Sequence, residues 1–427
     1  MTTPTALVPI DRTLSGKRIA FFTSVVGMGG SEVLVADAME AAHLAGAEVE
    51  CWSASGAAIR SLTASRGDRL SVNHNDWPPV PSDRTGGPQA VAAEGPDAVV
   101  RSRRGGWRRL VPFVVKRWLG FRRDAGLFAV ALQRSPPDLL FVNVNGSEAA
   151  SVGGASCGLL VVNCYHLSYT RSLGGPVERL GDWLARRATI RASGVTIHTS
   201  ATVRDQWSSV FHYPLDRTRV IYNGVDPALP VDRPDVRTKL GITPGQFAFC
   251  APGRLDPIKG HTHLIAAVAG LAERCPELVV LVCGDGDLRA GLEAQAAAAG
   301  VSRRVRFLGW RSDLPAVIAA CDAVVLPSVA SENLSVAVLE GLMAGVPAIV
   351  SRVGGMAEAV QDGRTGFVVP PADAQALANA MARLAADPAA ARRMGEAAAL
   401  DAQTRFTRRR MMAEYVDVFA AVIVSRR

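Results

Sequence analysis

The chain has 427 residues, 48% of them hydrophobic and 20% charged, which exceeds one compact core and predicts a globular protein with two domains of roughly 200 residues each. The formal net charge is +8, but residues 101–123 hold nine basic side chains and no acidic one, so the rest of the chain is close to neutral. Such a local patch, without a recognised nucleic-acid-binding motif, argues against a nucleic-acid partner.

The termini and the cysteines predict a cytoplasmic protein. The first residues lack the basic segment and apolar stretch of a signal peptide, and no apolar run approaches the length of about 20 residues that crosses a bilayer. The seven cysteines are dispersed, form no CxxC pair and lie partly inside apolar runs, so we expect reduced thiols and no disulfide framework.

In the first half of the chain, short apolar segments alternate with segments of helical periodicity. Strands are predicted for residues 18–24, 47–53, 138–144, 158–162 and 194–198, and a helix for residues 32–45. Residues 73–106 are rich in Pro, Gly, Ser and Asp and predict a long loop, and no pattern is readable over residues 73–137. The alternation predicts parallel βαβ units.

The second half repeats this alternation more regularly. Strands are predicted for residues 247–251, 278–283, 305–308, 323–326, 347–350 and 366–369, and helices for residues 334–344 and 408–424. The expected fold is therefore α/β, with two doubly wound, Rossmann-like domains facing across a cleft. We predict domains at residues 1–217 and 218–407, with the last helix, residues 408–427, packing back on the first domain.

The strongest chemical signal is the helix predicted at residues 334–344. This helix is apolar almost all round, so its one carboxylate, Glu340, needs a partner, either a sugar hydroxyl or an internal arginine or backbone group. Glu332 lies just before the helix, where it contacts a ligand or simply caps the helix. The backbone N–H groups of Asn333, Leu334 and Ser335 are expected at the helix N-terminus, which favours phosphate.

A second signal is the loop Gly253–Gly260, which follows a predicted strand. Arg254 offers a fork of N–H donors and Lys259 a compact charge, so together they suit a diphosphate. The alternative is a pair of solvated surface cations. Gly284–Asp287 follows the next strand, and its D-x-D pattern is interpreted as a tight turn without a metal.

Two further features lie in the first half. The glycine loop Gly27–Glu32 lacks both the G-x-G-x-x-G spacing and a Walker lysine, which argues against ATP or dinucleotide binding. His166 follows a predicted strand, and a residue at the carboxyl end of a strand faces the cleft in doubly wound folds. The alternative for His166 is an ordinary loop histidine.

Taken together, these motifs resemble the family-4 retaining glycosyltransferases (glycosyl transferases group 1), which have the GT-B fold. The resemblance rests on Gly253-Arg254, Lys259-Gly260, Gly284–Gly286, Phe307–Gly309, the E-x7-E pair Glu332 and Glu340, Ala344–Pro347, Gly354-Gly355 and Val220–Asp226, with weaker matches at Gly29–Glu32 and His166. It covers almost the whole chain except residues 73–137.

The resemblance implies a role for each candidate residue. Arg254 and Lys259 neutralise the donor diphosphate, Glu332 contacts the transferred sugar, and His166 lines the reacting face. The implied donor-binding residues are Gly29, Gly30, Gly253, Gly284, Asn333, Leu334, Ser335 and Glu340, of which Glu340 holds the ribose hydroxyls. No metal and no cofactor are implied besides the nucleotide-sugar co-substrate.

One departure from the family pattern bears on the donor. Many members have Glu-Gly-Phe-Gly where this chain has Glu332-Asn333-Leu334-Ser335, so we expect the extra side chains to narrow the sugar pocket. A UDP-sugar is favoured as donor, with a GDP-sugar next. The resemblance also implies retention of anomeric configuration, with departure and attack on the same face of the sugar because no carboxylate nucleophile is evident in the first domain.

The acceptor is expected in the first domain. Residues 101–123 interleave cations with aromatic and aliphatic residues, which suits an anionic membrane surface and a lipid-linked or polysaccharide acceptor. A solvated charged helix, or a groove for an anionic acceptor, is the alternative. The rival functions are a sugar-nucleotide epimerase, which needs no acceptor, and a non-catalytic sugar-nucleotide binding protein.

Overall fold

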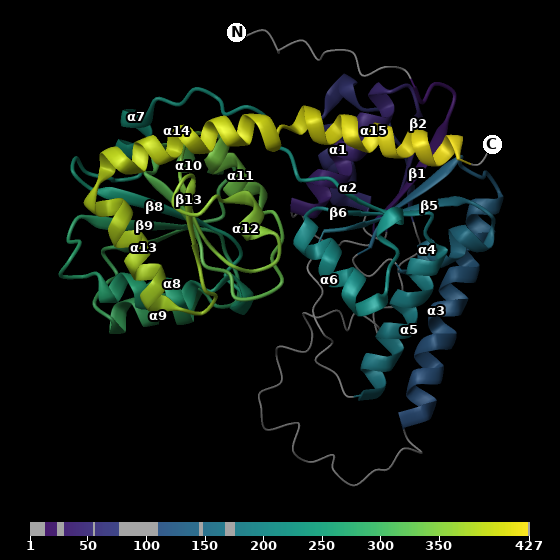
Figure 1. Ribbon diagram of the computed structural model, residues 1–427, viewed down its shortest axis with the longest axis horizontal. Helices are drawn as coiled ribbons and strands as arrows, with labels where there is room; N and C mark the ends of the chain where they lie inside the picture. The colour runs from purple at the N-terminus through teal and green to yellow at the C-terminus, as the bar shows by residue number, and fades with distance from the viewer. Residues whose placement is uncertain are drawn as a thin grey trace.

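The computed structural model describes residues 13–23, 30–53, 56–76, 110–144, 148–166 and 176–425, and these fold into two halves built on separate parallel sheets (Figure 1). The first half comprises the elements up to Val220 together with the last helix, and the second half comprises residues 227–405. The predicted class, α/β with two Rossmann-like units, is confirmed.

The first sheet has seven parallel strands in the order β3-β2-β1-β4-β5-β6-β7. Its strands are β1 (Arg18–Thr23), β2 (Glu48–Ser53), β3 (Asn73–Asp76), β4 (Leu139–Asn143), β5 (Leu160–Tyr165), β6 (Val195–His198) and β7 (Thr218–Val220). Buried positions run continuously along the central strands, as expected for a sheet covered on both faces.

The second sheet has six parallel strands in the order β10-β9-β8-β11-β12-β13. Its strands are β8 (Phe247–Pro252), β9 (Leu278–Cys283), β10 (Val305–Gly309), β11 (Ala323–Leu326), β12 (Ala348–Ser351) and β13 (Gly366–Val369). In each sheet the order reverses beside the first strand, at β1/β4 and at β8/β11, and such switch points are where doubly wound folds place ligands.

Helices cover both faces of each sheet (Figure 1). In the first half they are α1 (Gly30–Leu44), α2 (Gly56–Ala64), α3 (Leu110–Gln133), α4 (Glu148–Ser156), α5 (Pro176–Ala192) and α6 (Ala201–Phe211). In the second half they are α7 (Arg233–Lys239), α8 (His261–Gly270), α9 (Arg289–Ala298), α10 (Leu314–Ala320), α11 (Val336–Met343), α12 (Met356–Ala359), α13 (Ala374–Ala386) and α14 (Pro388–Arg405). Helix α15 (Arg408–Val424) ends the described chain.

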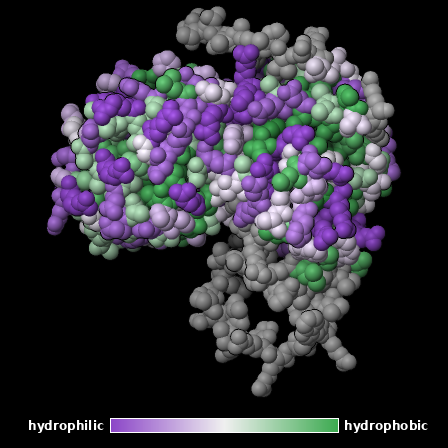
Figure 2. All heavy atoms as spheres, viewed as in Figure 1, coloured by the Kyte–Doolittle hydropathy of each residue, from purple (hydrophilic) through white to green (hydrophobic). Residues whose placement is uncertain are grey.

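Hydrophilic residues cover much of the visible face of both halves, with smaller hydrophobic areas between them (Figure 2). The seven cysteines are all free, and five of them are buried in the cores. In the described part of the chain, no helix combines the length and the apolar character that a membrane span needs.

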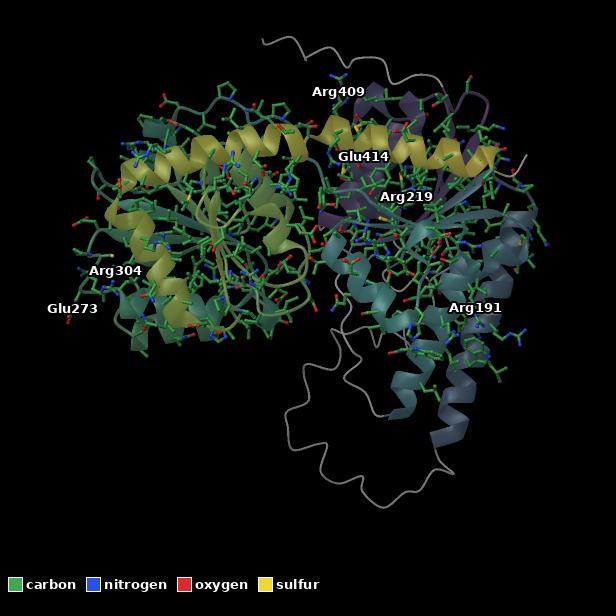
Figure 3. The ribbon with its side chains drawn as sticks, viewed as in Figure 1. Arg191, Arg219, Glu273, Arg304, Arg409 and Glu414 are labelled. Carbon is green, nitrogen blue, oxygen red and sulfur yellow. The ribbon has the colours of Figure 1, made fainter. Side chains whose placement is uncertain are left out.

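Helix α15 returns from the second half and packs on the first. Its inner face buries Tyr415 and Phe419, and the Phe419 ring lies 5.8 Å from Phe141 of β4. Its outer face is polar, and Figure 3 shows Arg409 pointing away from the body of the protein and Glu414 on the same helix. This amphipathic pattern explains why the helix covers the first sheet.

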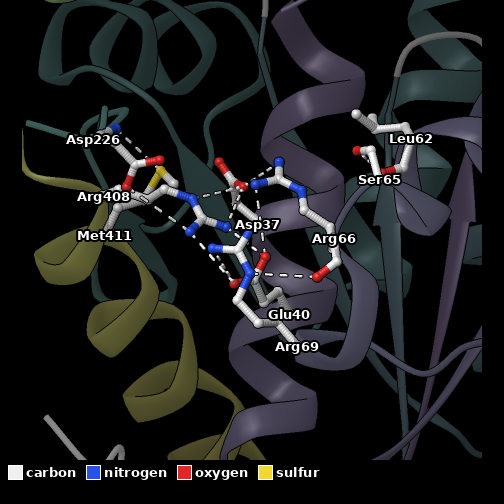
Figure 4. A network of polar contacts seen from close by, with 10 residues as sticks. Asp37, Glu40, Leu62, Ser65, Arg66, Arg69, Asp226, Arg408 and Met411 are labelled. Atoms are coloured by element: carbon white, nitrogen blue, oxygen red, sulfur yellow. Dashed lines mark hydrogen bonds and ion pairs between the residues drawn. The ribbon is translucent and has the colours of Figure 1, made fainter. Parts of the chain in front are cut away.

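A buried ionic network fixes the start of α15 (Figure 4). The Arg408 guanidinium donates to Asp37 at 2.8 Å and to Glu40 at 2.7 Å, both on α1. Arg66 adds a second cation 2.7 Å from Asp37. Because both carboxylates are buried, these arginines compensate charges that burial alone would make costly.

Two crossing segments run side by side between the halves. The Val225 N–H donates to the Phe406 carbonyl at 2.8 Å, and the Arg408 N–H donates to the Val225 carbonyl at 2.9 Å. A Cβ on Gly224 would lie 2.4 Å from the Thr407 carbonyl oxygen, so this position accepts only glycine without a backbone shift.

Two sequence predictions differ from the structure, and a third segment is described only in part. The first sheet extends beyond the boundary predicted at residue 217, because β7 pairs with β6. The loop predicted for residues 73–106 begins with a strand, β3, which is short and polar and therefore lacks an apolar signal. The basic segment 101–123 forms part of α3 from Leu110 onward, while residues 77–109 lie outside the described ranges.

Candidate functional site

Glycines shape the loops at the carboxyl edge of the second sheet. Gly284 has a φ of +155°, and a Cβ there would lie 1.9 Å from the Gly253 carbonyl oxygen. Gly286 is similar, with its Cβ position 2.6 Å from the Leu255 carbonyl oxygen. The Gly284 N–H donates to the Gly309 carbonyl at 2.8 Å. The loops after β8, β9 and β10 are therefore stacked backbone against backbone, which only glycine permits.

The loop after β8 is also attached to the loop after β11. Gly260 has a φ of +71°, and its Cβ position lies 2.1 Å from the Pro327 carbonyl oxygen. The Val329 N–H donates to the Ile258 carbonyl at 2.8 Å. These contacts hold Lys259, the residue before Gly260, beside the segment that carries Glu332.

Lys259 and Glu332 form an ion pair at the centre of the candidate site. The Lys259 Nζ lies 2.7 Å from Glu332 Oε2, which also accepts a hydrogen bond from Ser328 at 2.7 Å. The two charged side chains are only 17% and 11% exposed. Lys259 is therefore not a solvated surface lysine, and Glu332 does not cap the helix. The structure supports neither of these two alternatives from the sequence.

Arg254 differs from Lys259 in its environment. It is 63% exposed, and its guanidinium lies 3.1 Å from Asp256. The Asp256 carboxylate in turn accepts a hydrogen bond from the Lys259 N–H at 3.2 Å. One cation of the loop is therefore fixed inside the site, and the other stays accessible at its edge.

Helix α11 begins two residues later than predicted. Ser335 has extended backbone angles, φ −68° and ψ 123°, and acts as the N-cap without a side-chain capping bond. The N–H groups at the helix N-terminus are therefore those of residues 336–338, and not those of Asn333, Leu334 and Ser335 as predicted. The Ser335 side chain accepts no hydrogen bond from these N–H groups, and a helix N-terminus of this kind favours an anion.

Glu340 lies half-buried on α11. Burial raises the pKa of its carboxyl to about 7. Among the residues that the structure describes, no arginine or backbone group contacts this carboxylate. The internal-partner alternative therefore finds no support, and the ribose contact stays a prediction.

The side chains of Asn333 and Leu334, which were expected to narrow the sugar pocket, make contacts elsewhere, and the narrowing itself stays a prediction. The Asn333 side chain donates to the His166 carbonyl at 3.3 Å and to the Thr199 hydroxyl, both in the first half. Leu334 is buried in the second core, and its carbonyl accepts a hydrogen bond from Asn223 at 2.6 Å.

His166 lies at the end of β5, where the two halves meet. Its ring Nε2 lies 3.3 Å from the Cys164 thiol, and among the described residues no partner reaches Nδ1. Burial lowers the pKa of His166 to about 4, so the ring is neutral at pH 7. Of the predicted glycines in this half, Gly30 begins α1 and Gly29 lies outside the described residues.

Several contributing residues escaped the sequence reasoning. Ser328 follows a strand and looks like an ordinary loop serine, Thr199 and Glu358 carry no motif of their own, and Asn223 lies in the Val220–Asp226 motif without a role assigned to it. Asn223, Thr199 and Glu358 act through partners more than a hundred residues away, which no local pattern shows, whereas the partner of Ser328, Glu332, lies four residues later.

The D-x-D segment after β9 forms a turn with internal partners. Asp285 accepts a hydrogen bond from the Gly286 N–H at 2.9 Å and lies 3.6 Å from Arg289. Within the described ranges, no group of three or more His, Cys, Asp or Glu side chains is arranged to hold a metal ion. That the protein needs no metal stays a prediction.

Sequence profiles of known families match both halves of the chain. The profile described as "Glycosyl transferases group 1" matches residues 232–401, and "Glycosyltransferase Family 4" matches residues 28–229. The 2-deoxystreptamine glucosyltransferase of Streptomyces kanamyceticus is 31% identical over 277 residues, which is 60% of this chain and 70% of the relative.

Other relatives are matched over about half of their length. The D-inositol 3-phosphate glycosyltransferase of Corynebacterium glutamicum is 36% identical over 231 residues, 50% of this chain and 54% of the relative. Among solved structures, HepE of Anabaena in complex with UDP superposes with a TM-score of 0.72 at 22% identity, covering 95% of this chain and 100% of HepE. This likeness shows the shared two-sheet fold.

Proposed function

Because the chain belongs to the family-4 glycosyltransferases of the GT-B fold, we propose that it transfers a hexose-type sugar from a UDP-sugar to a glycan, lipid-linked or small-molecule acceptor. The observation that carries this proposal is the Lys259–Glu332 pair, enclosed by glycine loops at the switch point of the second sheet. A cation and a carboxylate there suit a phosphate and a sugar hydroxyl, respectively.

In this proposal, Arg254, Lys259 and the N-terminus of α11 bind the donor diphosphate. Arg254 is accessible, Lys259 is fixed by Glu332, and the N-terminus of α11 has no side-chain cap. These groups oppose negative charge, including the charge that grows on the leaving diphosphate. Glu340, on the same helix, then holds the ribose hydroxyls.

The proposal favours UDP as the nucleotide, with GDP next. HepE, with the same fold, has been solved with UDP and with UDP-glucose. A thermal-shift series with UDP-, GDP-, ADP- and TDP-glucose tests this point, since a ligand at 100 times its Kd stabilises the folded state by about 2.7 kcal/mol. Stabilisation by none of the four would contradict a nucleotide-sugar donor.

We propose retention of anomeric configuration without a covalent sugar–enzyme intermediate. Glu332 is already bound by Lys259 and Ser328, which makes its carboxylate a poor nucleophile. Departure and attack then take place on the same face, and the leaving diphosphate takes the acceptor proton. A side-chain sugar adduct found by mass spectrometry would contradict this mechanism, and NMR of the product reports the anomer.

A membrane surface is the proposed place of acceptor binding. Helices α3 and α5 project from the first half (Figure 1). The exposed face of α3 carries Leu119, Leu127 and Val130 beside Arg122 and Arg123. Apolar groups next to cations suit an anionic bilayer, which fits synthesis of a cell-surface polysaccharide or glycoconjugate at the cytoplasmic face.

Liposome flotation tests this surface. The wild-type protein is expected to float with vesicles that contain anionic lipid and to stay behind with neutral vesicles. Charge reversal at Arg122 and Arg123 should abolish flotation, whereas reversal at Arg392 and Arg393, an exposed pair on α14 of the second half, should not. Equal flotation of the two variants would remove the membrane proposal.

Neither rival function is favoured. The family match covers glycosyltransferases in both halves, whereas a sugar-nucleotide epimerase would interconvert the donor without any acceptor. Incubation with the donor alone separates the two, because an epimer forms only in the rival case. A non-catalytic binding protein would release no UDP when an acceptor is supplied.

A further inference from the structure

The two halves meet at the N-terminus of α6. Ser200, buried just before this helix, accepts a hydrogen bond from the Val203 N–H at 3.2 Å. The two N–H groups before Val203 are satisfied from the other half: Glu358 of α12 accepts from Ala201 at 2.9 Å and from Thr202 at 2.6 Å. A carboxylate from the second half thus caps a helix of the first half.

Glu358 is itself held on both sides. The Tyr222 hydroxyl, in the segment that joins the halves, donates to its carboxylate at 2.9 Å. Arg405, at the end of α14, donates to its backbone carbonyl at 2.7 Å. Burial alone would raise the pKa of Glu358, but the hydrogen bonds from Thr202, Ala201 and Tyr222 outweigh it and lower the pKa, so the carboxylate is charged at neutral pH.

Asn333 makes a second, inner contact between the halves. Its side-chain amide donates to the His166 carbonyl at 3.3 Å and to the hydroxyl of Thr199. Asn333, His166 and Thr199 are all buried. Asn333 is the direct neighbour of Glu332, so one side chain ties the Lys259–Glu332 pair to the backbone of His166.

Gly354 and Gly355 allow this close approach. A Cβ on Gly355 would lie 2.5 Å from Asn333 Oδ1 and 2.5 Å from the Ser200 Cβ, and a Cβ on Gly354 would lie 1.8 Å from the Glu332 carbonyl oxygen. The glycine pair therefore leaves room for the first half to touch the chain that carries Glu332 and Asn333.

We propose that Asn333 is a positioning residue that aligns Glu332 with the reacting face of the first half, and that Glu358 anchors the same contact from outside. The inference rests on the glycosyltransferase function, and it concerns the arrangement of the two halves during transfer.

The substitution Asn333→Asp tests the proposal. The carboxylate is isosteric, but it has no N–H to donate and faces the His166 carbonyl oxygen. We expect kcat to fall on the order of 10²-fold, because small misplacements of reacting groups cost about that much. The Kd for UDP should stay within about threefold of wild type, since no group assigned to the nucleotide changes. X-ray scattering with UDP bound should show a larger radius of gyration.

The matched control is Asn379→Asp, on the exposed side of α13, which should leave kcat, UDP affinity and scattering unchanged. Thr199→Val removes one partner of Asn333 and serves as the second variant if Asn333→Asp does not fold. In the double variant Asn333→Asp, Thr199→Val, the two losses in kcat should not add, because both substitutions break the same contact.

Glu358→Gln should separate the two halves less than Asn333→Asp does, as measured by the radius of gyration.

Two results would overturn the proposal. One is a fall in UDP affinity as large as the fall in kcat, which would place Asn333 in nucleotide binding. The other is wild-type kcat and scattering in the variant that folds. Scattering and UDP binding need no sugar transfer, so a wild-type protein that transfers no sugar contradicts the proposed function and leaves the effect of Asn333 on closure separately measurable.

Discussion

The two halves share a strand order but build their carboxyl edges differently. In the second half, the loops after β8, β9 and β10 contact one another through backbone groups, and glycines at positive φ make those contacts possible. In the first half, the described residues after β5 and β6 make their contacts through side chains from the other half, as Asn333 and Glu358 show.

This difference decides what a sequence can show. A site built from backbone contacts requires glycine at defined positions, so it can be recognised in the sequence from those glycines. A junction built by side chains uses ordinary polar residues whose partners lie far away in the chain. The predictions below probe the backbone-built half, from the largest expected effect to the smallest.

Removal of the fixed cation should have the largest effect. Lys259→Met is expected to lower kcat/KM on the order of 10³-fold, because a positioned group that opposes transition-state charge is lost. Steady-state kinetics with the donor found by thermal shift measure this effect. Lys239→Met, an exposed lysine on α7, is the control, and an equal loss in both variants would contradict the role of Lys259.

The glycine loops should show the next largest effect. Gly284→Ala places a Cβ 1.9 Å from a backbone oxygen, so the loop must shift and UDP affinity should fall on the order of 10²-fold. Gly300→Ala is the control: its φ is also positive, at +70° against +155° for Gly284, but its Cβ meets nothing within 4 Å. Titration calorimetry measures the UDP affinity of both variants. If Gly284→Ala and Gly300→Ala lose equal UDP affinity, steric overlap between the stacked loops does not explain the loss.

Glu340 should produce a small, pH-dependent effect. Its pKa is raised from 4.5 to about 7, so its contribution to stability is present below about pH 4.5 and is lost as the pH rises through about 7. Glu340→Gln should therefore gain melting temperature relative to wild type between pH 6 and pH 8.

UDP binding gives a second readout of Glu340. If ribose hydroxyls donate to the carboxylate, the wild type should bind UDP about tenfold more tightly at pH 8 than at pH 6, and Glu340→Gln should lose this dependence. Glu273→Gln, at the far edge of the second half in Figure 3, is the control. Equal pH dependence in wild type and Glu340→Gln would exclude the ribose contact.

The sequence predicted much of the fold because apolar periodicity marks buried strands and amphipathic helices. The strand Leu278–Cys283 and the helix Arg408–Val424 have the predicted bounds. The strand β3 was missed because Asn73–Asp76 is polar and lies at the sheet edge. The start of α11 was misplaced because Leu334 is buried before the helix begins, and hydrophobicity alone does not distinguish the two states.

The candidate site was predicted in part. Lys259 and Glu332 were each singled out, but their direct pairing depends on how the loop after β8 meets the loop after β11. The side-chain contacts of Asn333 could not be predicted, because its partners, Thr199 and His166, lie more than a hundred residues earlier in the chain. Contacts of such sequence separation leave no local pattern.

The return of α15 to the first sheet has a consequence for biosynthesis. Phe141 of β4 emerges from the ribosome early, but the ring that covers it, Phe419, is among the last residues described. The second half lies between these two residues and has its own cores. During translation, the second half is therefore expected to complete its fold before the first half does. Until α15 has been synthesised, the first half keeps an apolar face of its sheet uncovered.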